Sequence, residues 1–187
     1  DGSNGFRLDG VAASDRSGRT VAGGGDVNGD GFADLLIGAP DADPGSRSSA
    51  GSSYVVFGRA SGWGATLPLA SLDGTTGFRL DGPAASDRAG DAVAFAGDVN
   101  GDGFGDILVG AYLSNPGGRN DAGSTYLVFG RATGWTAALD LSTLGGSLGV
   151  RLDGAASSEF SGLAVAGGGD INADGLADVL VSASGAD

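Results

Sequence analysis

Four residue types are missing from this chain of 187 residues: cysteine, histidine, methionine and lysine. Without cysteine there are no disulfides, and without histidine, cysteine and lysine most nucleophiles, Schiff-base residues and transition-metal ligands are excluded. The 10 basic residues are therefore all arginine, and 23 acidic residues give a net charge of -13. Because nucleic-acid binding needs clustered positive charge and the arginines are spread along the chain, we expect no nucleic-acid partner.

Long hydrophobic runs and helical periodicity are also lacking. No stretch of about 18 apolar residues occurs, so we expect no membrane span in this segment. Glycine, in contrast, accounts for 39 residues, while 41% of the chain is apolar. Glycine supplies the positive φ angles of tight turns, and apolar runs lie between the glycine clusters. This composition predicts a folded protein of many short strands joined by tight turns.

A period of 72 residues runs through the whole chain. Residues 1–72 and 73–144 are identical at 46 positions, and the motif at 5–10 returns at 77–82 and, with one change, at 149–154. Such identity indicates duplicated copies of one supersecondary unit. The third copy ends at Asp187, after 43 of its 72 positions.

Each complete repeat contains four strand-like runs, which in the first copy are residues 6–9, 20–27, 32–39 and 52–59. Phe6 and Leu8 alternate with polar residues, as in a half-buried strand, whereas Leu35-Leu36-Ile37 fits a strand covered on both faces. Four short antiparallel strands in a repeated unit match the blade of a β-propeller. We predict an all-β fold of propeller-type blades of four antiparallel strands, comprising about two and a half blades of a larger propeller or repeat assembly.

The repeat also gives the predicted boundaries. These are 1–17 for an outer strand that completes a preceding blade, 18–89 and 90–161 for two blades, and 162–187 for a partial blade. Propellers close with about four to eight blades. We therefore expect the edges at 6–9 and 179–183 to pair with further repeats of the same chain or with neighbouring copies, since an open strand edge is a template for further strands.

The connection between the second and third strands of each repeat is an Asp-rich loop of nine residues, at 26–34, 98–106 and 170–178. Carboxylate or amide oxygens stand at positions 1, 3, 5 and 9, and the backbone carbonyl of position 7 is free to join them. The candidate metal ligands are Asp26, Asn28, Asp30, Phe32 and Asp34 in the first loop, Asp98, Asn100, Asp102, Phe104 and Asp106 in the second, and Asp170, Asn172, Asp174, Leu176 and Asp178 in the third.

Hard oxygen ligands in this number favour Ca²⁺ over Mg²⁺, which retains its waters and demands an octahedron. An EF-hand is excluded because Ile37, Val109 and Val181 stand where its bidentate Glu is required. Three carboxylates in one loop repel by roughly 1 to 4 kcal/mol per pair at a protein surface, and a cation would reverse that cost. The competing interpretation is an ordinary Asx-turn hairpin without metal, since Asn, Gly and Asp also dominate turns.

The segment from Ser17-Gly18 through the loop at 26–34 to 54–58 resembles an FG-GAP repeat, the blade unit of integrin alpha-subunit propellers and of many bacterial surface and secreted proteins. The resemblance covers the entire chain. It implies calcium at the first hairpin of each blade, held by the ligands named above. This chain departs from the motif where Ser17-Gly18 replaces Phe-Gly and where Tyr112 replaces the proline of Gly-Ala-Pro, which affects turns and packing rather than the metal ligands.

Two other repeated features allow a functional and a structural interpretation. Trp63 and Trp135 could stack on sugars, but a tryptophan that covers the blade edge is the favoured interpretation. Asp15-Arg16 and Asp87-Arg88 could form a catalytic pair, but the third copy has Glu159-Phe160. A local ion pair in a turn is the interpretation we favour for them.

No motif beyond the metal loops indicates catalysis, so we predict a protein that is not an enzyme. We expect a calcium-stabilised extracellular or cell-surface scaffold for adhesion, or for building a filament or matrix, with three Ca²⁺ sites and an extracellular protein or glycan as a further partner. The alternative is a propeller module of a secreted hydrolase or a carbohydrate-binding propeller.

Overall fold

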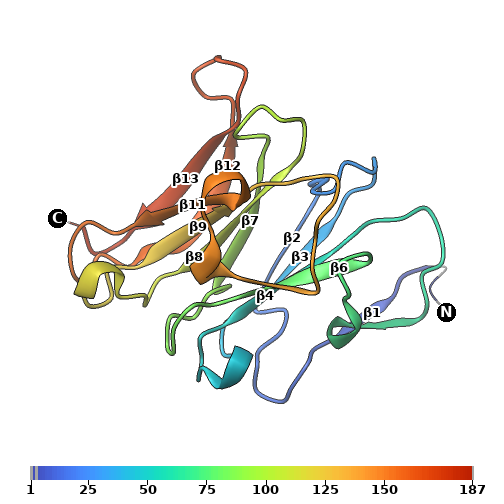
Figure 1. Cartoon of the computed structure of the whole chain (residues 1–187), viewed down its shortest axis with the longest axis horizontal. Helices are drawn as coiled ribbons and strands as arrows, with labels where there is room; N and C mark the ends of the chain where they lie inside the picture. Colours follow the sequence, from blue (N-terminus) through green and yellow to red (C-terminus); the bar gives the residue numbers. More distant parts are fainter. Residues whose placement is uncertain (1, 3, 187) are drawn as a thin grey trace.

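A computed structural model describes residues 2 and 4–186 and shows an all-β protein (Figure 1). The strands are β1 (Arg7–Asp9), β2 (Thr20–Gly23), β3 (Leu35–Ala39), β4 (Ser52–Val56), β5 (Thr66–Pro68), β6 (Gly77–Asp81), β7 (Ala92–Gly97), β8 (Asp106–Ala111), β9 (Ser124–Val128), β10 (Ala138–Asp140), β11 (Gly149–Asp153), β12 (Ser161–Gly169) and β13 (Asp178–Ala183). All-β character and propeller-type blades are therefore confirmed.

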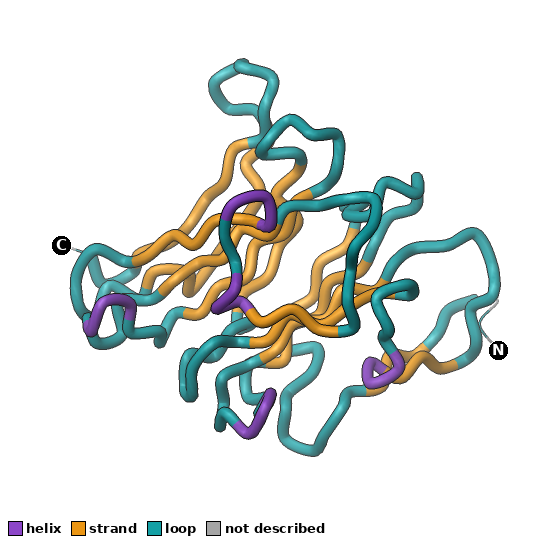
Figure 2. Tube along the Cα trace, viewed as in Figure 1, coloured by secondary structure: helices purple, strands orange, loops and turns teal. Residues whose placement is uncertain are grey.

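Within the described residues, helical structure is limited to five short 3₁₀ segments (Figure 2). These are η1 (Pro44–Ser46), η2 (Leu69–Ser71), η3 (Pro116–Gly118), η4 (Leu141–Thr143) and η5 (Gly146–Leu148). No helix in the described part of the chain has the length and apolar character needed to cross a membrane.

Two blades of four antiparallel strands form as the repeat predicts. The first has the strand order β6-β4-β3-β2 and the second β11-β9-β8-β7, so the outer strand of each blade comes from the next repeat. Strands β12 and β13 form the opening hairpin of a third unit. The described strands lie in separate neighbouring sheets that do not close into a ring (Figure 1). The strands are shorter than predicted because residues 24–34 belong to the loop and not to β2 or β3.

The two faces of strand β3 explain its continuous apolar sequence. Leu36 is fully buried in a cluster shared with the second blade, where it packs with residues such as Val93 and Ile107. Its neighbour Ile37 points to the opposite face and packs with Leu69 and Leu72. Successive side chains of a strand point to opposite faces, so a strand with neighbours on both faces is apolar at every position.

The sequence prediction missed one strand in each of the two complete repeats. Strand β5 pairs in parallel with β1, and its equivalent β10 pairs in parallel with β6, the outer strand of the first blade. Each segment has only three paired residues, and neither shows an alternating apolar pattern long enough to be recognised. Strand β10 of the second repeat therefore covers the outer edge of the first blade, and β5 occupies the equivalent place on β1. This pairing of a short strand with an outer strand is called the clasp below.

In each of the two complete repeats a tryptophan packs beside this clasp and stabilises it. Trp135 stacks on Phe78 with ring centroids 4.0 Å apart, and Trp63 stacks on Phe6 at 4.3 Å. The indole nitrogen of Trp135 donates to the carbonyl of Arg131, whose guanidinium lies 4.0 Å from the ring centroid. The interpretation of these tryptophans as covers of the blade edge is confirmed.

The proposed local pairs Asp15-Arg16 and Asp87-Arg88 are wrong. Arg16 and Arg88 instead bind the same carboxylate, Asp41, at 2.8 and 3.5 Å. Both arginines have positive φ angles, of 55° and 56°, which direct their side chains away from the preceding aspartate. Sequence adjacency does not place two side chains together in such a turn.

Burial raises the pKa of Asp87 to about 6. A carboxyl whose pKa is raised on folding adds stability that is fully present below its unfolded pKa, near about 3.9, and is lost as the pH rises through the folded value. We therefore expect the Asp87→Asn variant to show a smaller decline in its free energy of unfolding between about pH 4 and pH 6 than the unaltered chain. Urea unfolding at a series of pH values measures this, and parallel pH profiles would contradict it.

Candidate metal centre

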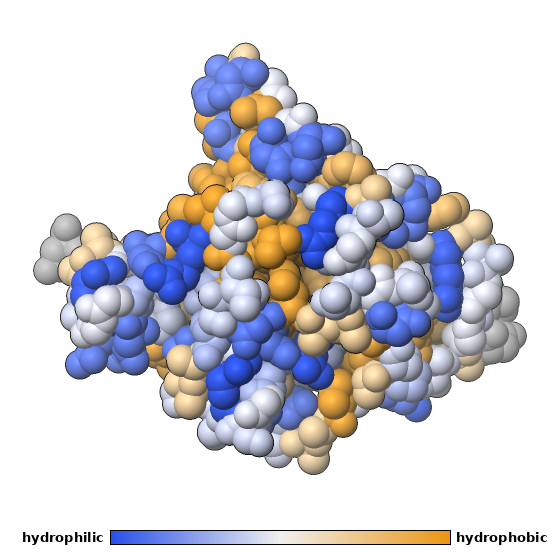
Figure 3. Space-filling view, in the orientation of Figure 1, coloured by the Kyte–Doolittle hydropathy of each residue, from blue (hydrophilic) through white to orange (hydrophobic). Residues whose placement is uncertain are grey.

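The three Asp-rich loops connect β2 to β3, β7 to β8 and β12 to β13, so they lie at the same end of their sheets (Figure 1). The third loop projects furthest, and Figure 3 shows a hydrophilic tip above apolar side chains at its base. The hairpin position that the sequence predicts for these loops is confirmed.

Asp26, at position 1, organises the first loop through its carboxylate. Its Oδ1 accepts hydrogen bonds from the amides of Gly29 and Asp30 at 2.8 and 3.1 Å, and its Oδ2 accepts one from Gly31 at 2.8 Å. Asp98 makes the same three bonds in the second loop, at 2.7, 3.0 and 2.8 Å. The first aspartate thus curls the chain so that positions 3 and 5 turn back toward it.

Positions 3 and 5 are joined to each other in all three loops. The amide oxygen of Asn28 accepts from the backbone of Asp30 at 3.1 Å, and its amide nitrogen donates to the Asp30 carboxylate at 2.9 Å. The corresponding contacts in the other loops measure between 2.9 and 3.0 Å. The contact between positions 3 and 5 is therefore the same in all three loops.

Asp34, at position 9, differs from the others because it is fully buried. Its two carboxylate oxygens accept from the amides of Val27 and Gly58, both at 2.8 Å, which ties the loop to the end of β4. Desolvation is the main reason that its pKa rises to about 6, and the carboxylates of Asp30 and Asp26 raise it further. Burial and the nearby charges of Asp102 and Asp98 likewise raise the pKa of Asp106.

The third loop repeats most of this pattern but differs at positions 4 and 9. Asp178 accepts from Ile171 at 2.7 Å but is only partly buried. Ala173 occupies the position of Gly29 and Gly101 and adopts the same left-handed conformation, with φ of 62°. A residue with a Cβ atom is strained there, at a cost of roughly 1 kcal/mol.

Neighbouring loops are connected through their backbones, which the sequence did not predict. The amide of Gly105 donates to the carbonyl of Asp26 at 2.8 Å, and the amide of Ala177 donates to that of Asp98 at 2.9 Å. Position 8 of each loop is thereby fixed to position 1 of the loop before it. The signal in the sequence is the constant 72-residue spacing, but only the packing of adjacent blades shows that the loops touch.

The donor set of each loop suits a hard cation. All side-chain donors at positions 1, 3, 5 and 9 are oxygens, and the carbonyls at position 7 accept no backbone hydrogen bond among the described residues. No loop aspartate forms an ion pair with a described arginine. Each ionised carboxylate can accept about four bonds, so Asp30 and Asp34, which accept two apiece, retain capacity for a cation.

The carboxylates themselves are not gathered into a finished cluster. Within the described residues no group of three or more Asp, Glu, His or Cys side chains converges as a metal-binding set. The Asn28 amide nitrogen faces Asp30, and Asp34 is turned inward by its two amide partners. Calcium binding would therefore have to draw Asp30 away from the Asn28 nitrogen, a rearrangement of exposed side chains within a loop whose backbone is already formed.

Comparison with known proteins identifies the repeat of this chain. Residues 17–56 and 89–128 each match the FG-GAP repeat. Integrin alpha-V of Gallus gallus is 33% identical over 166 residues, or 87% of this chain and 14% of the integrin. Integrin alpha-PS2 of Drosophila melanogaster is 34% identical over 166 residues, or 87% of this chain and 11% of the integrin.

A relative of another type shares the repeat. Phosphatidylinositol-glycan-specific phospholipase D of Mus musculus is 36% identical over 109 residues, which cover 58% of this chain and 12% of the phospholipase. The chain thus spans less than a sixth of the length of each of these relatives.

Proposed function

Because the chain belongs to the FG-GAP repeat family, we propose that it is a calcium-stabilised, non-enzymatic module of an extracellular or cell-surface protein that serves adhesion or builds a filament or matrix. The observation that carries this proposal is the Asp-rich loop, which recurs three times with an all-oxygen donor set and with the same hydrogen bond from the amide of position 5 to the carboxylate of position 1. The similarity to integrin alpha subunits supports a role in adhesion.

Calcium would be held by the ligands at positions 1, 3, 5, 7 and 9 of each loop. When bound, the ion neutralises carboxylates that otherwise repel one another. The chain's own contribution is to hold the loop backbone in place, through the first aspartate and the amides that it binds. Since adjacent loops are joined by backbone hydrogen bonds, ions bound in successive loops would stiffen the same edge of the assembly.

Association with further repeats is supported by the surface of the third unit. Leu163 and Leu180 on β12 and β13 are 40% and 52% exposed. Among the described strands, β13 pairs only with β12, so one of its edges has no strand partner. Edges and faces of this kind take up further strands or blades. We propose that further repeats of the same chain or a neighbouring copy cover them.

We expect the Asp102→Ala variant to lose calcium binding in the central loop alone. Titration calorimetry should give three sites for the unaltered chain and two for the variant. The two remaining affinities should change far less than that of the central site, because the neighbouring loops are joined through the backbones of Asp98 and Gly105 and not through the Asp102 carboxylate. Asp9→Ala removes one carboxylate outside the loops and should leave three sites. Three undiminished sites in Asp102→Ala would show that Asp102 is not a ligand.

Adhesion itself is tested with beads coated with the chain. The proposal expects beads to aggregate in calcium and to disperse on chelation, with weaker aggregation for a Leu180→Asp variant that charges the exposed face of β13. The second candidate is a propeller module of a secreted hydrolase, which the similarity to the phospholipase favours. Beads that stay dispersed in calcium but bind vesicles containing glycosylated phosphatidylinositol would support that candidate instead.

A further inference from the structure

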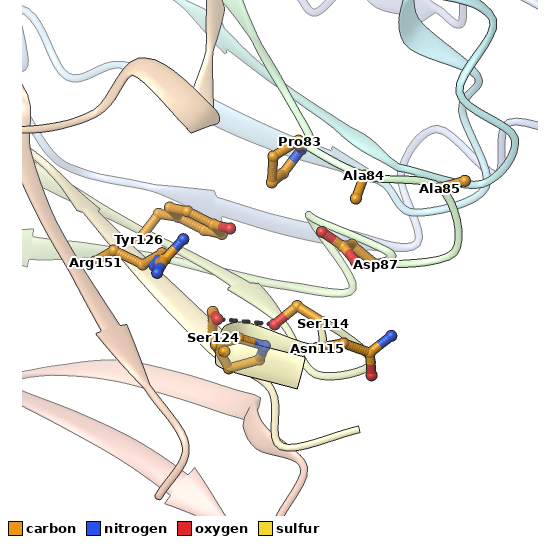
Figure 4. A pocket seen from close by; sticks show the side chains of 11 residues that line it. Pro83, Ala84, Ala85, Asp87, Ser114, Asn115, Ser124, Tyr126 and Arg151 are labelled. Atoms are coloured by element: carbon orange, nitrogen blue, oxygen red, sulfur yellow. Dashed lines mark hydrogen bonds between the residues drawn. The ribbon is translucent and has the colours of Figure 1, made fainter. Parts of the chain in front are cut away.

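A cavity of about 270 Å³ lies in the second blade, at the end of the sheet opposite the Asp-rich loop (Figure 4). Its walls come from the turn that follows β6, the connection between β8 and β9, and strands β9 and β11. A cavity of about 210 Å³ occupies the equivalent place in the first blade. Tyr54 and Tyr126, like Arg79 and Arg151, line the two cavities at positions 72 residues apart. The cavity is therefore built into the repeat.

Three polar side chains from three separate segments face the space in the second blade. Figure 4 shows the Tyr126 hydroxyl and the Arg151 guanidinium side by side on one wall, with the Asp87 carboxylate across from them. Tyr126 and Asp87 are only 1% and 4% exposed. These positions are fixed by the fold, because Tyr126 lies in the middle of β9 and Asp87 in a turn held by backbone hydrogen bonds.

The charges in the cavity are only partly compensated. Arg151 is bound to Asp153 at 2.8 Å, which leaves its remaining N–H groups as donors without an excess of positive charge. Asp87 forms no ion pair with a described arginine, because Arg88 is directed to Asp41. The Asp87 carboxylate, an acceptor without a cationic partner, therefore lies opposite two donors, the Tyr126 hydroxyl and the Arg151 guanidinium.

The rest of the wall is apolar. Pro83 and the methyl groups of Ala84 and Ala85 lie above the space in Figure 4, and the ring of Tyr126 forms part of its side. The Ser114 hydroxyl donates to Ser124 at 2.8 Å, so it is already engaged at the floor. A few fixed polar groups within an apolar wall are typical of sites for small molecules, and this cavity is smaller than the range of about 300 to 1,000 Å³ that suits drug-sized ligands.

We propose that each of these two cavities binds one neutral monosaccharide unit of a glycan. Sugar hydroxyls both donate and accept, so one ring can bond to the Asp87 carboxylate and to the Tyr126 and Arg151 donors at once, while its C–H groups contact the proline and alanine wall. Asp87 disfavours an anion. A simple cation would leave the Tyr126 hydroxyl and the free N–H groups of Arg151 without acceptors, whereas a sugar hydroxyl supplies them. The site is remote from the Asp-rich loops, so it goes beyond the calcium proposal and does not depend on it.

The test is a titration of the isotopically labelled chain, followed by NMR, with the methyl glycosides of mannose, galactose, glucose and N-acetylglucosamine. A single sugar ring should bind with a dissociation constant on the order of 1 mM, as its small number of atoms allows. At least one glycoside should shift the amides around Ala84 and Tyr126 and, independently, those around Ala12 and Tyr54. Methylguanidinium and acetate serve as charged probes.

Two variants make the assignment specific. Ala84→Gln fills the second cavity from an exposed position and should abolish the shifts there, while the cavity lined by Ala12 keeps its affinity as an internal control. Tyr126→Phe removes only the hydroxyl and should weaken binding in the second cavity by at least about tenfold, because a site built to bond a hydroxyl discriminates strongly. An unchanged spectrum elsewhere shows that both variants fold.

The proposal is overturned if no glycoside shifts these amides, or if the shifts persist at full strength in Ala84→Gln. Tighter binding of methylguanidinium than of every glycoside, at the same amides, would make the cavity a cation site and would also overturn it. If the loops fail to bind calcium but the cavities still bind glycosides, the monosaccharide proposal is supported and only the proposed calcium function fails. The two failures are therefore distinguishable.

Discussion

Removing calcium is expected to lower the melting temperature of this chain by about 5 to 10 °C for each loop that binds the ion. A ligand held by the folded state alone, at a hundredfold excess over its dissociation constant, stabilises by about 2.7 kcal/mol. For a chain of this size 1 kcal/mol corresponds to about 2 to 4 °C. Thermal unfolding followed by circular dichroism, with calcium, with chelator and with magnesium in place of calcium, measures the effect.

The matched control is the triple variant Asp30→Asn, Asp102→Asn, Asp174→Asn. Each asparagine keeps an oxygen that can accept the amide at position 7, as Asp30 does from Phe32 at 2.9 Å, but removes a charge. Without metal the variant should be at least as stable as the unaltered chain, since repulsion within each loop is relieved. With calcium it should be less stable. If chelator leaves the melting temperature of the unaltered chain unchanged, calcium stabilisation is refuted.

Trp135→Ala is expected to lower the free energy of unfolding by about 3 kcal/mol, because truncation of large core aromatics costs about 3 to 5 kcal/mol and Trp135 is only partly buried. Its ring stacks on Phe78, which is fully buried in the core between the two blades, and also lies 6.3 Å from the Phe57 ring. The substitution opens the clasp that holds β10 on β6. Urea unfolding with the calcium concentration held constant measures the loss.

Trp63→Ala is the paired control within the same chain. Trp63 stacks on Phe6 beside the three-residue strand β1, where Arg7 is exposed, so we expect a loss of about 1 kcal/mol, which is the scale of one aromatic pair. The difference between the two losses in the free energy of unfolding measures how much the contact between β10 and the first blade stabilises the protein. Equal losses would show that the tryptophans contribute through their own repeat and not through the neighbouring blade.

Much of the architecture follows from local sequence. The 72-residue identity, the alternation around Phe6 and Leu8 and the apolar run of Leu35 to Ile37 were sufficient to predict four-stranded blades with the loop on the first hairpin. These features are local because strand alternation and turn-forming glycines act over a few residues. The loop ligand set also follows from residue type and spacing, although calcium itself remains a prediction.

The contacts between repeats were decided only by tertiary structure. The three-residue strand β5 has too little pattern to be recognised, and its parallel pairing with β1 depends on how two blades pack. Arg16 binds Asp41 rather than its neighbour Asp15 because a positive φ turns it away. The burial of Asp34 depends on the amide of Gly58, which lies 24 residues further along the chain. Sequence patterns report which face of an element is covered, whereas the identity of the covering residue depends on the packing of segments that are distant in the chain.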